Sequence, residues 1–260
     1  MKKMRRKRRR SGFGVACAAV VLAVACGFLT AAVADGQAPV PAAEADKAEI
    51  HADKTAQPSG EASVRLSVPA LCQYPELPTG CEATAAAMVL QYYGEAITPS
   101  ALAGEWLTCS EQFYWKNGVL YGPDPDKAFA GDPFSQNAYG CFASVIVRAV
   151  NKGSRLCTAQ RLKGATLAQL CSDYIDRGAP LLVWATMDMR PVSQGSRWQL
   201  ADGRELVWPA GEHCLVLTGY DAERYWFNDP QTGTAVSYEK ALCEQRFCAL
   251  GSQAVVIRRR

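Results

Sequence analysis

The segment Gln73-Tyr-Pro-Glu-Leu-Pro-Thr-Gly-Cys-Glu82 opens an apolar run that stops at Gly94. The apolar residues of this run recur at helical spacing, so the sequence predicts a helix over Glu82–Tyr93 with a buried face. Glycine commonly follows a helix C-terminus, and Gly94 fits that position. Thr79 and Glu82 also have the spacing of a capping box, with the threonine as N-cap and the glutamate at the third helical position.

Cys81 is then expected in the first turn of that helix, where backbone N–H groups are unpaired and the helix dipole is positive. Such a position favours the thiolate form of a cysteine, which is the nucleophilic form. Gln73 lies eight residues upstream and could donate its side-chain amide to an oxyanion beside the Cys81 N–H. The segment therefore predicts a nucleophile with an oxyanion donor. The alternative is a buried structural cysteine that happens to begin a helix.

His213 is the only histidine between residues 64 and 260, since the other one, His51, lies further upstream. It stands near the start of the apolar run Glu212-His-Cys-Leu-Val-Leu-Thr-Gly-Tyr-Asp221, which predicts a strand. It follows Cys81 by 132 residues, within the separation of about 130–150 residues found between the nucleophile and histidine of papain-type enzymes. His213 is therefore the candidate general base, although a lone histidine is more often a hydrogen-bonded core residue.

Asp229 follows the next predicted strand, Tyr225–Asn228, and lies 16 residues after His213. A short turn at Asp221–Arg224 predicts that the two strands form a hairpin, whose outer ends can then meet. The carboxylate could hold the imidazole in one tautomer, as the third member of a catalytic triad does. The alternative is an aspartate that only forms the turn before Pro230.

The remaining elements indicate the fold class. Helices are predicted mainly in the first half and strands in the second, an order typical of α+β proteins rather than of alternating parallel ones. Besides the helix after Cys81, helices are predicted at residues 144–151 and 167–177. Strands are predicted at residues 64–68, 181–186, 213–220, 225–228 and 253–258.

The N-terminus predicts an address segment rather than part of the fold. Eight of the 28 Lys and Arg residues lie in residues 1–10, and residues 11–34 carry no charge. A membrane span needs roughly 20 apolar residues, and the basic end would stay in the cytoplasm. Residues 1–34 are therefore predicted to be a signal peptide or a signal-anchor helix, with lipidation at Cys26 as a third option. We expect residues 35–63 to be a flexible linker and residues 64–260 to be an extracytoplasmic domain, secreted or anchored to the membrane.

The amino-acid composition argues against nucleic acid as a partner and against a metal or cofactor site. Beyond residue 34 the chain has 20 basic and 25 acidic residues, a net charge of −5, so nucleic acid is not an expected partner. Nine of the 11 cysteines lie in this part, where an extracytoplasmic setting allows disulfides, and an odd number leaves at least one thiol unpaired. Cys243 and Cys248 are close enough in sequence for a local bridge. No C-x-x-C pair occurs and histidine is scarce, so neither a metal site nor a cofactor is predicted.

Together these segments resemble the bacteriocin-leader-processing peptidase-like family of papain-like cysteine peptidases, in particular its stand-alone secreted branch. The resemblance rests on Gln73, on Leu-Pro-Thr-Gly-Cys81-Glu, on Gly-Glu-His213-Cys-Leu-Val-Leu-Thr-Gly-Tyr-Asp and on Asn-Asp229-Pro. Residues 126–135 and 138–141 are similar to a family segment between helices, and the likeness extends over residues 64–257. The chain has no Gly-rich phosphate loop, which distinguishes it from the transporter-linked relatives.

The resemblance implies a papain-like fold in which N-terminal helices pack on a C-terminal antiparallel sheet. It also implies Cys81 as nucleophile, His213 as general base and acid, Asp229 as orienting carboxylate and Gln73 as oxyanion donor. The implied reaction is hydrolysis of a peptide bond in a peptide or protein substrate through a thioester on Cys81. The sequence indicates neither the oligomeric state nor the particular substrate.

Two other functions fit the same residues. A secreted enzyme that faces a cell wall could cleave peptide cross-links there, although the sequence contains no wall-binding repeat. An inactive, disulfide-braced surface module is the second alternative, and it requires Cys81 to be bridged. A count of free thiols separates this module from an enzyme, because a bridged cysteine cannot act as a nucleophile.

Overall fold

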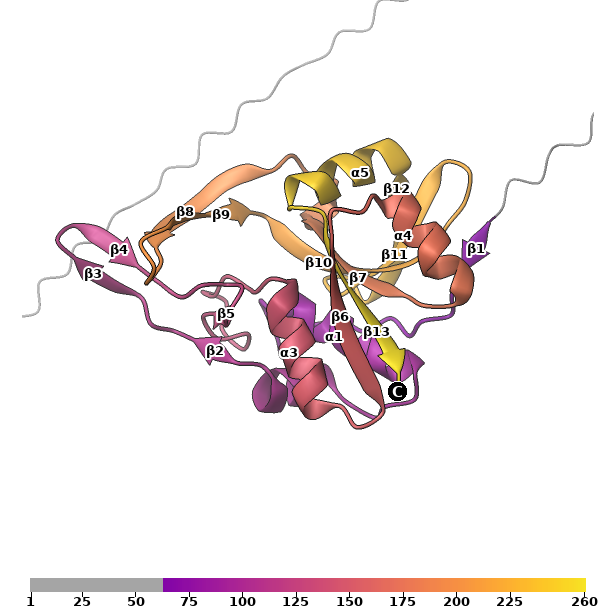
Figure 1. Cartoon of the computed structure of the whole chain (residues 1–260), viewed down its shortest axis with the longest axis horizontal. Helices are drawn as coiled ribbons and strands as arrows, with labels where there is room; N and C mark the ends of the chain where they lie inside the picture. The colour runs from indigo at the N-terminus through magenta and orange to yellow at the C-terminus, as the bar shows by residue number, and fades with distance from the viewer. Residues whose placement is uncertain (1–62) are drawn as a thin grey trace, which may run out of the picture. The chain divides into compact units, whose positions relative to one another are not determined.

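A seven-stranded sheet forms the centre of the computed structural model, which describes residues 63–260 (Figure 1). Six strands follow one another in the order β12, β11, β10, β7, β13 and β6, and β1 pairs with β10. Every pairing in this sheet is antiparallel. The strands are β1 (Val64–Arg65), β6 (Cys157–Lys163), β7 (Leu181–Thr186), β10 (Glu212–Tyr220), β11 (Arg224–Asp229), β12 (Thr234–Glu239) and β13 (Gln253–Arg259).

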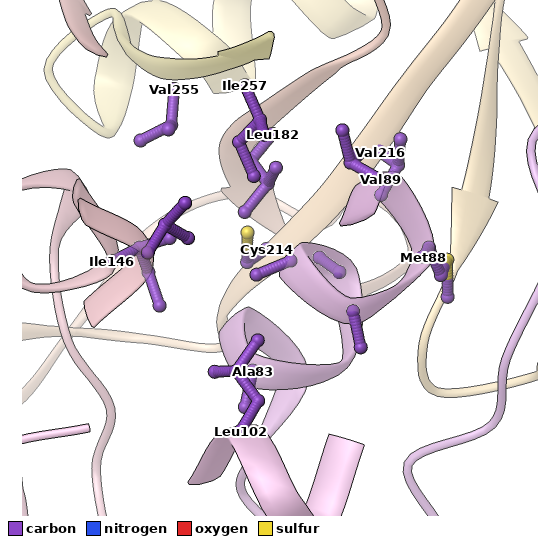
Figure 2. Close-up of a cluster of buried hydrophobic side chains, with 14 of the residues drawn as sticks. Ala83, Met88, Val89, Leu102, Ile146, Leu182, Cys214, Val216, Val255 and Ile257 are labelled. Carbon is purple, nitrogen blue, oxygen red and sulfur yellow. The ribbon is translucent and has the colours of Figure 1, made fainter. Parts of the chain in front are cut away.

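Helices cover both faces of this sheet because its central strands carry apolar side chains on both sides. On β7, Leu182 and Trp184 belong to one buried cluster, whereas Leu181 and Val183 belong to another. The first cluster includes residues of α1 and α3, and the second includes residues of α4 and α5. Figure 2 shows the first cluster, with Cys214 of β10 among the side chains around α1. The helices are α1 (Cys81–Tyr92), α3 (Ala143–Gly153), α4 (Leu167–Asp173) and α5 (Lys240–Ala249).

Helix α1 is buried along most of its length, and its end is set by a glycine. Every residue from Cys81 to Leu90 is buried, and the alanines among them let the helix backbone approach the sheet closely. Gly94 follows the helix with a φ of 89°, in the left-handed region. The N–H of Glu95 donates to the Leu90 carbonyl at 3.0 Å, as in a Schellman ending. The predicted glycine cap is confirmed. Shorter helical segments are α2 (Pro99–Ala101), η1 (Leu102–Trp106), η2 (Ile175–Arg177) and η3 (Met187–Met189).

A second sheet, of four strands, lies to one side of the main sheet (Figure 1). Two of its strands precede α3 in the chain, and the other two lie between β7 and β10. Trp198 and Trp208 of the later pair are buried in a small cluster that also contacts Tyr139, so aromatic packing joins this sheet to the loop before α3. The strands are β3 (Tyr114–Lys116), β4 (Val119–Tyr121), β8 (Ser193–Gln199) and β9 (Glu205–Ala210), and a separate parallel pair is β2 (Cys109–Ser110) with β5 (Phe129–Ala130).

The predicted α+β class is confirmed, with one correction to the layering. Helices do pack on a large antiparallel sheet, and α1 and α3 from the first half of the described chain cover one face. The predicted helices, at residues 82–93, 144–151 and 167–177, all precede the predicted strands at residues 181–258. Helix α5 instead follows β12 and packs on the second face together with α4. Strand β7 carries apolar residues toward both faces, so one layer of helices could not bury it.

The predictions for the N-terminus fall on residues outside the described range. The described range excludes the predicted signal segment at residues 1–34. It also excludes the predicted linker at residues 35–63, apart from its last residue. The boundaries of both segments stay predictions. Within residues 63–260, no helix combines the length and the apolar composition that a membrane crossing requires.

Candidate active site

The antiparallel pairing of β10 and β11 brings His213 and Asp229 together. Val216 pairs with Asn228 in this hairpin, so the histidine and the aspartate lie on the same face near its open end. His213 Nε2 and Asp229 Oδ1 are 2.7 Å apart, and both side chains are buried. The same Oδ1 accepts a hydrogen bond from the Gln231 N–H at 2.8 Å, which fixes the carboxylate. This arrangement holds the ring proton on Nε2 and leaves Nδ1 as the nitrogen available for proton transfer.

Cys81 begins α1, close to the predicted position, but the helix start is built differently from the prediction. Gly80 is the N-cap, and no side chain caps the helix. The Thr79 hydroxyl donates instead to a backbone carbonyl of a neighbouring loop at 3.0 Å. A Cβ on Gly80 would come within 2.8 Å of the Leu77 Cβ, so a glycine is required there. The predicted capping box of Thr79 and Glu82 is therefore wrong.

Glu82 turns into the protein interior, where it is fully buried. Its Oε1 accepts the Cys141 N–H at 2.5 Å, and its Oε2 accepts the Cys81 thiol at 3.3 Å. The Trp184 indole N–H donates to the Cys141 carbonyl at 2.9 Å, so both backbone groups of Cys141 are held. A buried carboxyl without hydrogen-bond donors is costly, and the Cys141 N–H supplies a donor to Glu82 in the interior. This tertiary contact explains why the local capping pattern fails.

The Cys81 thiol is held as a neutral group. Burial raises its pKa well above the ordinary value, and the nearby carboxyls of Glu82 and Glu212 raise it further. The backbone N–H of Cys214 lowers the thiol pKa but is a smaller influence. This direction is opposite to the one predicted for a helix N-terminus, because burial and the acidic neighbours act against the helix dipole.

Gln73 lies at the same site, but its amide donors are occupied. Its Nε2 group donates to the carbonyl oxygens of Leu77 at 3.1 Å and Pro78 at 3.0 Å. Its backbone N–H donates to the Pro230 carbonyl at 2.8 Å, which ties this loop to the turn after Asp229. The Oε1 atom is buried without a hydrogen-bond partner. Since both Nε2 hydrogens support the loop before α1, the oxyanion-donor role of Gln73 stays a prediction.

One pocket of about 190 Å³ brings three of the four predicted residues together. Cys81, His213 and Gln73 all line it, and Asp229 joins them through its hydrogen bond to the histidine. Within residues 63–260 no hydrogen bond joins the thiol to the imidazole, because the thiol donates to the carboxyl beside it. Much of the remaining wall is aromatic or apolar: Tyr74, Pro78, Ala138, Tyr139, Met187 and Trp208.

Two glutamates beside the thiol were not predicted to belong to the site. The sequence pattern predicts a helix-cap role for Glu82 and no role for Glu212, the residue before the histidine. The Cys81 sulfur and one carboxyl oxygen of each glutamate lie within 4.8 Å of one another. The expectation that the protein needs no metal stays a prediction. Sequence position is the feature that could have identified both glutamates, because each is adjacent to a predicted catalytic residue.

All nine cysteines of residues 63–260 are free thiols, so the expected disulfides are not found in this part of the chain. Cys243 and Cys248 both lie on α5, where residues five apart point about 140° away from each other. The first is buried and the second is exposed, so the expected local bridge is wrong. Cys81 is also free, which removes the premise of the inactive module braced by a Cys81 disulfide.

A buried helix that begins with a cysteine, packed on an antiparallel sheet that carries a histidine–aspartate pair, defines a papain-like arrangement. The chain belongs to the Peptidase_C39 like family, whose sequence profile matches residues 65–255. The family resemblance seen in the sequence is thereby confirmed. Membership indicates a hydrolase of the cysteine-peptidase class.

The chain is also similar to individual proteins and solved structures. The chain is 29% identical over 188 residues to the uncharacterized protein YvpB of Bacillus subtilis strain 168, which covers 71% of each protein. It is similar to a crystal structure from Bacillus anthracis that is provisionally described as a C39-like peptidase. That match has a TM-score of 0.67 and 28% identity, and it covers 77% of this chain and 99% of the other. A double glycine motif protease from an AMS/PCAT transporter, solved with its leader peptide, aligns with a TM-score of 0.43 and 15% identity, covering 76% of this chain and 98% of the other.

Proposed function

We propose that the protein is a cysteine peptidase that hydrolyses peptide bonds through a thioester on Cys81, with His213 as general base and acid and Asp229 as orienting residue. The observation that carries the proposal is the buried His213–Asp229 hydrogen bond of 2.7 Å, in a pocket that Cys81 also lines. An imidazole held by a carboxylate at one nitrogen is oriented to exchange a proton at the other. Family membership supports the reaction class.

The reaction proceeds in two acyl-transfer steps. His213 Nδ1 takes the thiol proton as the Cys81 sulfur attacks the substrate carbonyl carbon. Asp229 stabilises the imidazolium that forms, because it accepts the Nε2 proton. The imidazolium then protonates the leaving amine, and an acyl thioester remains on the sulfur. A water molecule that gives a proton to the imidazole hydrolyses the thioester and regenerates both residues.

The oxyanion of each tetrahedral intermediate needs N–H donors. The backbone N–H groups in the first turn of α1 have no carbonyl partner within the helix, and they lie next to Cys81. Gln73 supplies the second donor in this proposal. Its Nε2 binds the carbonyls of Leu77 and Pro78 in the unliganded protein, so one of these bonds is exchanged for the oxyanion.

The substrate in this proposal is a peptide or protein chain outside the cytoplasm. The walls formed by Tyr139, Met187 and Trp208 offer apolar surface to an uncharged part of a peptide. The extracytoplasmic setting rests on the sequence alone, in which basic residues 1–10 precede the uncharged residues 11–34. Residues 1–34 then serve as a signal peptide or a membrane anchor.

The test is hydrolysis of a mixed peptide pool by the purified full-length protein, with the products read by mass spectrometry. We expect cleavage by the wild type and none by Cys81→Ala, because the thioester cannot form. Cys248→Ser is a matched control, since it removes an exposed thiol on α5 and should keep the wild-type rate. A peptide aldehyde should also add its mass to Cys81 alone among the nine thiols of residues 63–260. Appreciable turnover by Cys81→Ala would contradict the proposal.

A further inference from the structure

Two buried carboxyl groups lie beside the candidate nucleophile. Glu82 is fully buried and Glu212 is 8% exposed. Their carboxyls flank the same backbone position, because a Cβ on Gly140 would lie 2.6 Å from Glu82 Oε1 and 3.1 Å from Glu212 Oε2. One oxygen of each carboxyl also lies within 4.8 Å of the other and of the Cys81 sulfur. The two carboxyls and the thiol therefore form one cluster.

This cluster has no lysine or arginine to balance two negative charges. Within residues 63–260 no ion pair involves either glutamate. Besides Cys81, the titratable groups that face the pair come from β2, the loop before α3 and β10: Cys109, Cys141, His213 and Cys214. Burial raises the pKa of both carboxyls, and the charge of Glu82 raises that of Glu212 further. Two such carboxyls cannot both stay ionised at neutral pH.

The hydrogen-bond donors around Glu82 and Glu212 determine which of the two carboxyls is ionised. Glu82 accepts the Cys141 N–H at 2.5 Å and the Cys81 thiol at 3.3 Å. Glu212 Oε1 is buried without a hydrogen-bond partner within residues 63–260, and Glu212 lines the pocket. Donors favour the ionised form of a carboxyl, and burial without donors favours the acid. The proton therefore belongs to Glu212 and the negative charge to Glu82.

We propose that Glu82 and Glu212 are positioning residues of the nucleophile: they hold one proton between them, and the charge left on Glu82 binds the S–H of Cys81 and delays its ionisation. This role rests on the proposed function, because it concerns the group that attacks the substrate. Catalysis then requires the thiol to leave Glu82 and give its proton to His213. The pair thereby keeps Cys81 in a thiol form of low reactivity until its proton passes to His213.

The proposal predicts different results for two isosteric substitutions. In Glu82→Gln, the remaining carboxyl of Glu212 lacks donors and stays protonated, so the cluster loses its charge. In Glu212→Gln, Glu82 keeps both of its donors and stays ionised, so the charge that faces Cys81 is unchanged. The ionisation of Cys81 should therefore shift to lower pH in the first variant and remain in place in the second.

The experiment is iodoacetamide labelling of the full-length protein, with the rate at Cys81 read from its own peptide by mass spectrometry. A range from about pH 6 to about pH 11 brackets the ordinary thiol pKa of about 8.5. We expect the labelling curve of Glu82→Gln to move at least one pH unit lower, an increase of about tenfold in rate at a fixed pH on its rising limb. Glu212→Gln should follow the wild type. So should the control Glu244→Gln, which removes a carboxylate that accepts two N–H groups at the start of α4.

Infrared spectroscopy provides a second, independent measurement. A protonated buried carboxyl has its own carbonyl band, which we expect in the wild type at neutral pH, in Glu82→Gln, and not in Glu212→Gln. This measurement needs only Glu212→Gln, so it stands even where Glu82→Gln fails to fold. An equal labelling shift in both glutamine variants, or a band that survives Glu212→Gln, would overturn the proposal.

Neither measurement uses a substrate, so the two proposals fail separately. A wild type that shows the shared proton but cleaves no peptide contradicts the peptidase function alone. A wild type that cleaves peptides but shows neither the band nor the labelling shift contradicts the carboxyl pair alone.

Discussion

The two halves of the candidate site are held in place by different forces. Strand pairing between β10 and β11 sets the positions of His213 and Asp229, and a single short hydrogen bond joins them. Side-chain hydrogen bonds hold the other half, with the Cys81 thiol on Glu82 and the Gln73 amide on the loop before α1. Backbone pairing fixes His213 and Asp229 on one face of the hairpin, whereas the Cys81 thiol and the Gln73 amide are held by side-chain hydrogen bonds that a substrate can replace. The base is therefore preorganised and the nucleophile is adjustable.

The largest expected effect comes from breaking the preorganised half with Asp229→Asn. The amide can still occupy the site, but it does not stabilise an imidazolium or select the Nε2–H tautomer as a carboxylate does. Loss of the orienting carboxylate in the serine-protease triad lowers kcat about ten-thousandfold, and we expect a loss of about a thousandfold or more here. The measurement is kcat on a cleaved peptide.

Asp221→Asn is the matched control for this change. Asp221 lies at the turn of the same hairpin and accepts hydrogen bonds from the backbone of Glu223 and Arg224 and from the Trp226 indole. Its replacement removes a charge from the hairpin without touching His213, so kcat should stay within about twofold of the wild type, as expected for a surface change away from the site. Equal losses in the two variants would mean that Asp229 acts through the hairpin and not through the imidazole.

Gln73→Ala addresses the adjustable half and should have a smaller effect. Removal of one oxyanion donor typically lowers kcat about a hundred- to a thousandfold, and the first-turn N–H groups of α1 remain. A donor to the transition state lowers kcat with little change in KM, so the two constants should separate. The loss of two hydrogen bonds to Leu77 and Pro78 should also lower the melting temperature. A lower melting temperature with an unchanged kcat would show that Gln73 only supports the loop.

Strands with continuous apolar sequence could be predicted closely, and polar elements could not. The predicted bounds of β7 are those observed, whereas β10 begins one residue earlier than predicted and β11 is one residue longer at each end. In contrast, β8 contains only one buried residue, Trp198, and α5 contains only two, Cys243 and Phe247. These elements lacked a periodic apolar pattern. Their positions depend on tertiary packing that a single sequence does not display.

The candidate site shows the same contrast between features that local sequence patterns predict and features that depend on tertiary packing. A hairpin joins residues near in sequence, so the meeting of His213 and Asp229 followed from strand and turn patterns. The capping box failed because Glu82 binds Cys141, which lies 59 residues away. The raised pKa of the Cys81 thiol could not be predicted locally either, because the burial of Cys81 arises from tertiary packing. Local patterns thus predicted the half of the site that is built locally.

The smallest expected effect concerns stability, and it follows from the raised pKa of Glu212. Below the ordinary carboxyl value of 4.5, the folded and unfolded states are both protonated and the contribution of Glu212 to stability is complete. As the pH rises, the unfolded chain loses this proton while the folded protein retains it, so that contribution declines until the folded pKa is passed. Glu212→Gln removes this titration. We therefore expect its melting temperature to fall less than that of the wild type between about pH 5 and about pH 8, and to exceed it at the higher pH by about 2–4 °C, the shift that ~1 kcal/mol produces in a domain of this size.

Calorimetry at both pH values checks this expectation, with Glu244→Gln as the control. Glu244 accepts N–H groups from Leu167 and Ala168, so its replacement should lower the melting temperature at both pH values instead of raising it. Equal pH dependence in the wild type and in Glu212→Gln would show that Glu212 is ionised in the folded protein. The adjustable half of the site would then carry two charges, and the resistance of Cys81 to ionisation would have to come from both carboxyls.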